Sequence, residues 1–415
     1  MTQFASFTAD LRIRTLISCS AAVLLSAHGM AMAATTTPAV SETEIAAAAL
    51  ADSATRQVAD TAIPASTSIY NLYVATTGSD SNPGTATRPF KTISRAASLA
   101  KPGTTVHVAP GTYLGNVTTN VSGTATARIR YVSDTKWGAK IIGTGTEFMW
   151  TNRGNYTDIV GFDITGPGRE GIINLASYTL IQGNHVHNLT VSGGCTGGGG
   201  AGINNASYTT SDGDIIGNVV HDIGVPGKCN AVQGIYSANL RGRIYNNIVY
   251  RASSWGIHLW HAADQVLIAN NTVFANGSAN MGGGIVIGVG DAPGGKYLTN
   301  TKVVNNIVYN NPYHGIHQGC DAGRNCLGSG NVIANNLVIG SSTPFTPNAK
   351  IVATSTIAAN PQFVNYLATG GGDYRLKITS PAVNKGITSF APTTDIDSIA
   401  RPRGAALDLG AYENY

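Results

Sequence analysis

Charged residues are scarce in this sequence. Only 12% of its 415 residues are Asp, Glu, Lys or Arg, and the formal net charge is +4. So small a positive balance does not indicate a nucleic-acid partner. Patterns of long amphipathic helices are also scarce, whereas the chain has 50 glycines and 43% hydrophobic residues. This composition favours many short strands joined by tight turns around a large core.

Long apolar runs are almost absent as well. Beyond the N-terminal segment, no run reaches the roughly 18 residues that a transmembrane helix needs, so we expect no membrane span. The one apolar run begins at Leu16, just after two arginines, and leads to a small-residue site that ends at Ala33. These features predict a signal peptide over residues 1–33 and a secreted or periplasmic protein. Cleavage after about Ala33 would lower the net charge from +4 to +3, because two arginines and one aspartate leave.

The rest of the chain divides into a linker and one domain. Residues 34–68 are rich in Ala, Thr and Ser, which is typical of a linker. Residues 69–415 are predicted to form the domain, which begins with a strand, a turn and a short helix at about residues 92–100. Ile93 and three alanines would share one face of that helix. Such a helix suits a cap over the open end of a β-structure.

A strand–Asn–strand pattern repeats through the middle of the domain. Successive repeats lie 24 to 35 residues apart, so coils with loops of unequal length are expected. Asn tolerates the left-handed conformation of a sharp bend, and stacked amides can hydrogen-bond from coil to coil. We therefore predict an all-β fold, a single right-handed parallel β-helix with a short N-terminal capping helix. The repeated residues are Asn184, Asn218, Asn247, Asn271, Asn306 and Asn336.

Three motifs near the start of the domain resemble the N-terminal region of bacterial pectate-lyase-like β-helix proteins. They are GSDSNPGT at residues 78–85, PFKTI at 89–93 and PGTY at 110–113. The end of the chain resembles the C-terminal coils of this superfamily, in the subgroup described as choice-of-anchor. The resemblance covers about residues 70–415 and implies a long groove that binds a glycan. It does not name a reaction, because the superfamily includes polysaccharide lyases, glycoside hydrolases, epimerases and proteins without a known reaction.

Strand alternation predicts which side chains face such a groove. The isoleucine of each Gly-Ile strand would point inward, so the following residue would point outward. Trp260 lies further along the outward side, and the turns before these strands would add histidines and charged residues. The inward positions are Ile172, Ile203, Ile235, Ile257, Ile285 and Ile316, and the outward ones are Ile173, Asn204, Tyr236, His258, Val286 and His317. The turns would contribute His187, His221, Asp222, Lys228, Arg251 and His314.

These residue types suit β-elimination of an acidic, uronate-containing glycan without an organic cofactor. The reaction needs a base near neutral pKa and positive charge that stabilises the enolate-like intermediate. His258 or His221 would act as the base. Arg251 and Lys228 would neutralise the substrate carboxylate, and Tyr236 would pass a proton to the leaving oxygen. The other candidates would bind the substrate by stacking and hydrogen bonds; they are Trp260, His317, His314, His187 and Asp222. The leading hypothesis is a monomeric polysaccharide lyase.

Two other functions remain open on the same fold. A glycoside hydrolase needs two carboxylates about 5 to 9.5 Å apart. The candidates are chiefly Asp222, with Glu170 and Asp264 as further options. A non-catalytic glycan-binding or surface protein needs only the groove. In that case the histidines are ordinary strand residues, Trp260 packs under a loop, and Arg251 binds a neighbouring turn.

Calcium is a possible cofactor, since several lyases of this fold use Ca²⁺ held by acidic side chains. Asp212 and Asp214, or Asp291 and Asp321, offer the oxygen ligands that Ca²⁺ prefers. Short Asp/Gly turns of this kind are more often turns alone.

The cysteines predict crosslinks. Four remain after cleavage, and an even number in an oxidising compartment favours two disulfides, with three pairings possible by number alone. Cys195 and Cys229 lie in the long turns of consecutive coils, where a disulfide would clamp two loops. Cys320 and Cys326 would close a small loop just after His317.

Overall fold

A computed structural model describes residues 69–145, 148–191, 195, 198–290, 297–320 and 325–414. The predicted signal peptide and linker lie outside the described residues. No helix in the described ranges is long and apolar enough to cross a membrane.

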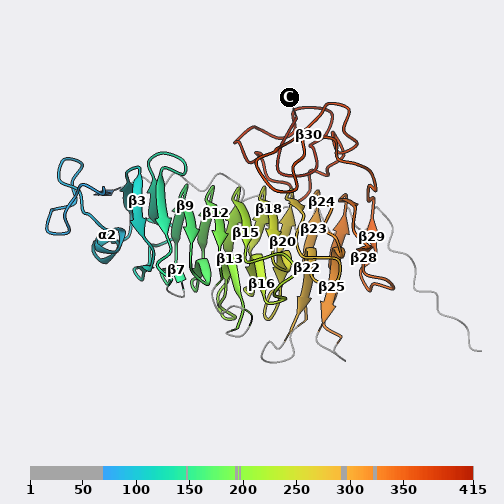
Figure 1. The fold of residues 1–415 in the computed structure, drawn as a ribbon, viewed down its shortest axis with the longest axis horizontal. Helices are drawn as coiled ribbons and strands as arrows, with labels where there is room; N and C mark the ends of the chain where they lie inside the picture. Colours follow the sequence, from blue (N-terminus) through green and yellow to red (C-terminus); the bar gives the residue numbers. More distant parts are fainter. Residues whose placement is uncertain are drawn as a thin grey trace, which may run out of the picture. The chain divides into compact units, whose positions relative to one another are not determined.

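The chain winds through three parallel sheets in turn, and each coil adds one strand to each sheet (Figure 1). Together the sheets form the predicted right-handed β-helix. Sheet A contains β1 (Tyr70–Val74), β2 (Thr104–Val108), β5 (Ile129–Ser133), β8 (Thr157–Val160), β11 (Thr179–Gln182), β14 (Gly213–Ile216), β17 (Arg243–Tyr245), β20 (Leu267–Ala269), β23 (Lys302–Val304), β26 (Val332–Ala334) and β29 (Ala353–Thr354).

The other two sheets follow sheet A within each coil. Sheet B contains β3 (Gly111–Leu114), β6 (Ala139–Ile142), β9 (Asp163–Gly166), β12 (His185–Leu189), β15 (Val219–Ile223), β18 (Ile248–Ala252), β21 (Thr272–Phe274), β24 (Ile307–Tyr309) and β27 (Leu337–Ile339). Sheet C contains β4 (Val117–Thr119), β7 (Phe148–Asn152), β10 (Glu170–Asn174), β13 (Gly200–Asn205), β16 (Val232–Ser237), β19 (Trp255–Leu259), β22 (Gly283–Val289), β25 (His314–Cys320) and β28 (Thr343–Phe345).

Aliphatic side chains fill the space between the three sheets. The predicted inward isoleucines of sheet C pair in register from β10 to β25, and each is at most 1% exposed. Burial of one such side chain contributes about 1.5–3 kcal/mol relative to leaving it in water. The stacked core therefore fixes which face of each strand points outward, because a slip of one residue would place the isoleucines in solvent.

The predicted asparagine ladder joins the coils where sheet A turns into sheet B. All six residues are fully buried, and the side-chain amide of each of the first five donates to the amide oxygen of the next ladder Asn over 2.9–3.1 Å. The left-handed bend, however, falls on the residue before each ladder Asn, for example Gly183 and Asn270. A further ladder at the end of the sheet C strands joins Asn152, Asn174 and Asn205. This ladder was not predicted from the sequence.

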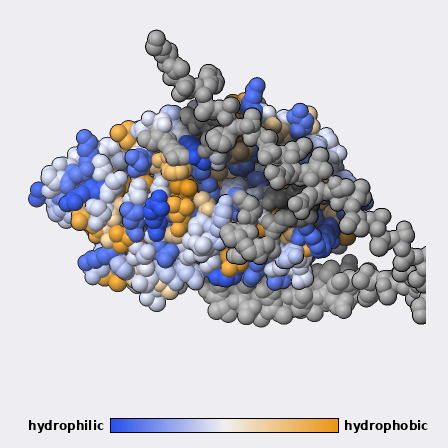
Figure 2. Space-filling model, turned by 90° about the horizontal axis from the view of Figure 1, so that it is seen from below, coloured by the Kyte–Doolittle hydropathy of each residue, from blue (hydrophilic) through white to orange (hydrophobic). Residues whose placement is uncertain are grey.

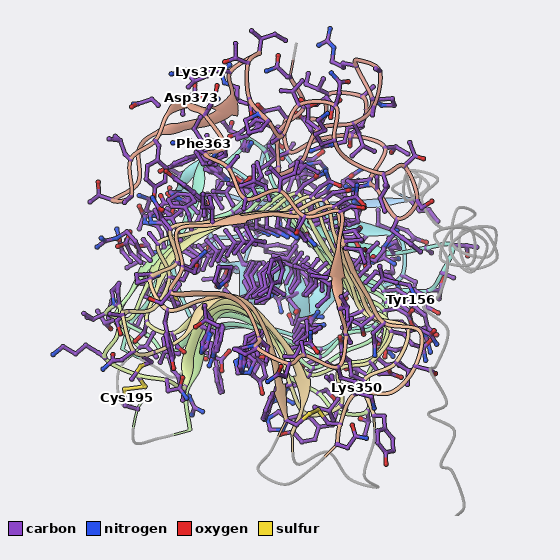
Figure 3. The ribbon with its side chains drawn as sticks, turned by 90° about the vertical axis from the view of Figure 1, so that its right-hand side faces the viewer. Tyr156, Cys195, Lys350, Phe363, Asp373 and Lys377 are labelled. Carbon is purple, nitrogen blue, oxygen red and sulfur yellow. A yellow bond between two sulfur atoms is a disulfide. The ribbon has the colours of Figure 1, made fainter. Side chains whose placement is uncertain are left out.

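The two ends of the β-helix are structured differently. Helix α2 (Ile93–Leu99) begins after the N-cap Thr92 and buries Ile93 and two alanines, as predicted. At the other end, a segment that includes the antiparallel pair β30 (Phe363–Asn365) and β31 (Asp373–Leu376) packs on the outer faces of sheets A and B. Figure 3 shows Phe363 and Asp373 of this segment at the top, away from the loops that carry Cys195 and Lys350.

Candidate functional site

The outward column predicted for sheet C is present in the structure. Tyr236 on β16 pairs with His258 on β19, which pairs with Val286 on β22 and then His317 on β25. Asn204 and Ile173 continue the column on β13 and β10. Figure 2 views the molecule from the side on which sheet C lies and shows hydrophobic patches among hydrophilic ones.

A second outward column lies three residues earlier and brings a buried tryptophan to the same face. Trp255 on β19 pairs with Gly283 on β22, and Gly283 pairs with His314 on β25. Because Gly283 has no side chain, the rings of Trp255 and His314 stack across it, with centroids 5.6 Å apart and planes 10° apart. A Cβ at Gly283 would lie 2.8 Å from the Cβ of His314. Trp255, which the sequence analysis missed, is 8% exposed and supports the histidines beside it.

Trp260 packs over β22 near the end of that strand opposite to Gly283. Its ring lies next to Gly288 and Gly290, where an added Cβ would come within 2.8 Å of the indole. It also makes an edge contact with His258, with centroids 5.5 Å apart. The small residues of β22 thus leave room for the rings of both neighbouring strands. We call the resulting group the aromatic cluster: Tyr236, Trp255, His258, Trp260, His314 and His317.

The three histidines of the aromatic cluster are uncharged at neutral pH. Burial, together with His261 and His317, lowers the pKa of His258 to about 3. Burial and the neighbouring His314 lower the pKa of His317 to about 4, and burial also lowers that of His314. The Nδ1 atoms of His258 and His314 are buried without a hydrogen-bond partner among the described residues. Such atoms normally have a partner in folded proteins, so the two nitrogens retain unused hydrogen-bonding capacity beneath the outer face of sheet C.

Two disulfides lie in the loops next to the cluster. Cys195 is bonded to Cys229 and links the loops that precede β13 and β16, whereas Cys320 is bonded to Cys326. Both pairings match the predictions. Lys228, beside Cys229, is exposed. Its loop therefore brings a positive charge to the edge of sheet C.

Comparison with known proteins assigns the family. Residues 72–342 match the family described as Pel9A-like, right handed beta helix region. The chain belongs to this family. Its relatives include pectate lyase L of Dickeya dadantii (strain 3937), which is 24% identical over 406 residues, covering 82% of this chain and 90% of the relative. Pectate lyase L of Dickeya chrysanthemi is 25% identical over 403 residues, with the same shares.

A solved structure supports the fold of this Pel9A-like protein. The crystal structure of pectate lyase Pel9A aligns with a TM-score of 0.57 at 20% identity, covering 83% of this chain and 96% of that chain. At this identity the likeness concerns the β-helix fold, whereas residue roles must come from the site itself.

Four predicted site residues do not lie on sheet C, so the prediction that turns place them beside its outward column is wrong. His187, His221, Asp222 and Arg251 belong to β12, β15 and β18 of sheet B. The reason is that the strand predicted after each ladder Asn extends through these residues, which therefore do not lie in the turn that leads into sheet C. Of the residues expected from the turns, Lys228 lies in a turn and His314 is the first residue of β25.

The four residues that lie on sheet B and not on sheet C form a compact polar group there. His221 Nδ1 lies 2.6 Å from Asp222 Oδ2, and Arg251 makes an ion pair with the same carboxylate. Burial alone would raise the pKa of Asp222, but hydrogen bonds from His221 and Arg251 hold it below its ordinary value. His187 contacts Asp163 on β9 in the same way, over 2.8 Å. Arg251 is thus engaged on sheet B and does not neutralise a ligand on sheet C.

The carboxylates considered for hydrolysis lie on three different sheets. Asp222 is on sheet B, Glu170 is buried on β10 of sheet C, and Asp264 lies in the turn before β20 of sheet A. Glu170 accepts a hydrogen bond from Asn204, and Asp264 accepts one from the backbone of Thr299. These three therefore do not form a facing pair across a bound sugar.

The described candidates for calcium are already paired. Asp212 binds Arg241 over 2.8 Å, and Asp214 binds Arg243 over 2.7 Å. Each arginine neutralises the carboxylate that would attract a cation, so these two aspartates do not fit a Ca²⁺ site. The other two candidates, Asp291 and Asp321, lie outside the described residues.

Proposed function

We propose that this protein is an exported polysaccharide lyase that binds an acidic glycan on the outer face of sheet C. The aromatic cluster carries this proposal, because it combines flat apolar rings with three histidines on one outer face. Two relatives carry the name pectate lyase, which supports a uronate-containing substrate. Two disulfides and the predicted signal peptide support export.

In the proposed reaction His258 accepts the proton next to the uronate carboxylate. A carbon–carbon double bond forms as the bond to the leaving oxygen breaks, and Tyr236 donates a proton to that oxygen. The two rings meet at a centroid distance of 5.1 Å, so both groups reach one sugar unit. Lys228 would neutralise the substrate carboxylate from its loop. Arg251, which was expected to share this role, is excluded by its place on sheet B.

The low pKa of His258 sets a requirement on the substrate. An imidazole with a pKa of about 3 is uncharged at neutral pH but is a weak base. A carboxylate bound beside the ring would favour the imidazolium and raise this pKa. The proposal therefore requires that the acidic group of the glycan lies next to His258, so that the substrate itself strengthens the base.

A panel of uronate-containing polysaccharides tests the proposal. We expect absorbance in the ultraviolet band of an unsaturated uronate to rise on at least one substrate. The rise should be lost in His258→Ala and retained in His107→Ala, a matched change on β2 of sheet A. New reducing ends without this absorbance would contradict elimination and indicate hydrolysis.

A non-catalytic glycan-binding protein is the second candidate. It is favoured by one observation, the low pKa of His258, because binding needs an uncharged hydrogen-bonding ring and no base. Retention of a polysaccharide on affinity electrophoresis, together with no chemical change to it, would support this candidate and exclude the lyase.

A further inference from the structure

Three histidines on the outer face of sheet B converge. His185 and His187 are two residues apart on β12, so both side chains leave the same face of the strand. His221 on β15 pairs in register with His187. The three residues offer ring nitrogens that all lie within 4.8 Å of one another, and all three side chains are partly buried.

The contacts around these rings orient the nitrogens. Nε2 of His185 and Nε2 of His221 are 2.8 Å apart. Because Nδ1 of His221 lies 2.6 Å from the Asp222 carboxylate, that nitrogen carries the proton and Nε2 presents its lone pair. A carboxylate behind a histidine is the usual outer partner of a metal ligand. Asp163 stands in the same relation to His187, at 2.8 Å from its Nε2.

The charge around the cluster is balanced. Asp163 and Asp222 supply two negative charges, and Lys140 and Arg251 each make an ion pair with one of them. A divalent cation would therefore enter a site with two ordered carboxylates behind its ligands. Imidazole nitrogens bind zinc, copper and nickel in preference to calcium or magnesium.

We propose that His185, His187 and His221 form a binding site for a divalent transition-metal ion, with zinc as its reference ligand. Asp163 and Asp222 hold the rings of His187 and His221 as outer partners, and a solvent molecule completes the coordination. With metal–nitrogen bonds of about 2.0–2.1 Å, tetrahedral ligands stand about 3.3 Å apart. The two Nε2 atoms at 2.8 Å would thus separate by about half an ångström on binding.

The site lies on a different sheet from the aromatic cluster and does not depend on the proposed lyase activity. It would join β12 to β15, the two coils whose loops are also linked by the disulfide of Cys195 and Cys229. We therefore expect the metal to stabilise this part of the β-helix, since an ion that binds only the folded state raises the unfolding midpoint.

Titration calorimetry with zinc chloride tests the site on protein purified without a polyhistidine tag and freed of metal by a chelator. We expect one zinc per chain and a rise in the thermal midpoint. Copper and nickel should compete with zinc, whereas calcium should not. The variants His185→Gln and His221→Gln should bind at least tenfold more weakly, and Asp222→Asn about 10- to 100-fold more weakly.

Two controls make the result decisive. His107→Gln removes a histidine of sheet A whose Nδ1 lies 2.9 Å from Asp134 Oδ1. This variant should bind zinc as the unchanged protein does. His221→Phe keeps a ring that can stack on Tyr250, 4.5 Å away, but removes the nitrogens. Folded His221→Phe protein without zinc binding would support the proposal. Equal zinc affinity in His221→Phe and the unchanged protein, or no binding by the unchanged protein, would overturn it.

Discussion

The asparagine ladder predicts a large loss of stability when one member in its middle is removed. The side chain of Asn271 donates to Ile244 O, Ala269 O and Asn306 Oδ1, and its oxygen accepts from the backbone and side-chain amides of Asn247. In Asn271→Ala, the buried N–H of Asn247 loses its acceptor, which costs about 1–3 kcal/mol. The four other lost hydrogen bonds cost about 0.5–1.5 kcal/mol each, so we expect a total loss of about 3–9 kcal/mol.

Guanidinium unfolding followed by circular dichroism measures this loss. Asn365→Ala is the matched control, because Asn365 is exposed at the end of β30, and it should change the free energy of unfolding by less than about 0.5 kcal/mol. Coils of a solenoid interact mainly with their neighbours, so we expect the transition of Asn271→Ala to broaden as well as shift. A loss below about 1 kcal/mol, or one equal to that of Asn365→Ala, would refute the view that the ladder holds the coils together.

Three further predictions follow from the site and its surroundings. The contribution of His258 and His317 to the free energy of unfolding should be fully present above pH 6.5 and fall as the pH decreases toward 4. The pKa values of these rings are about 3 and about 4 in the folded chain. In the unfolded chain the same rings take up protons near pH 6.5. The slope is up to about 1.4 kcal/mol per pH unit for each ring, and His258→Gln should reduce it in unfolding curves. Trp260→Ala should weaken glycan binding about tenfold in affinity electrophoresis, whereas Trp260→Phe should retain most of it. Removing the disulfide of Cys195 and Cys229 should lower the free energy of unfolding by about 3.7 kcal/mol, and removing that of Cys320 and Cys326 by about 2.2 kcal/mol. The difference arises because the closed loops span 34 and 6 residues. Equal losses in thermal unfolding would contradict this ranking.

The register of sheet C could be predicted because two independent patterns specify it. The Gly-Ile strands and the ladder asparagines recur in the same order, and together they specify the outward column that contains Tyr236, His258 and His317. The bend itself was placed one residue late. The buried amide makes the coil-to-coil hydrogen bonds, so the strained backbone conformation falls on its neighbour, which is Gly in some coils and Asn in others.

The set of residues on the outer face of sheet C was predicted less completely than the register of its strands. His187 and His221 were expected in turns because the end of the strand after each ladder Asn is hard to place, since strands such as HVHNL contain polar residues and have no Gly-Ile signal. Trp255 was missed for a different reason. Its position on the cluster depends on Gly283 in the next coil, and the pairing of these two residues is visible only across strands. Contacts across a glycine have no periodic signature within one segment.

The histidines of sheet B continue a column of stacked rings that runs along its outer face. His187, His221, Tyr250, Phe274 and Tyr309 pair in register through successive coils. Tyr250 and Phe274 are buried beneath the C-terminal segment, where they pack against Tyr374. The two histidines occupy the more exposed coils of the column. Stacking alone would be served by Tyr or Phe at every position, so it does not explain why imidazole replaces them there beside ordered carboxylates. The ring nitrogens do, because they bind Asp163 and Asp222 and can also hold the proposed metal ion, which Tyr and Phe rings cannot do.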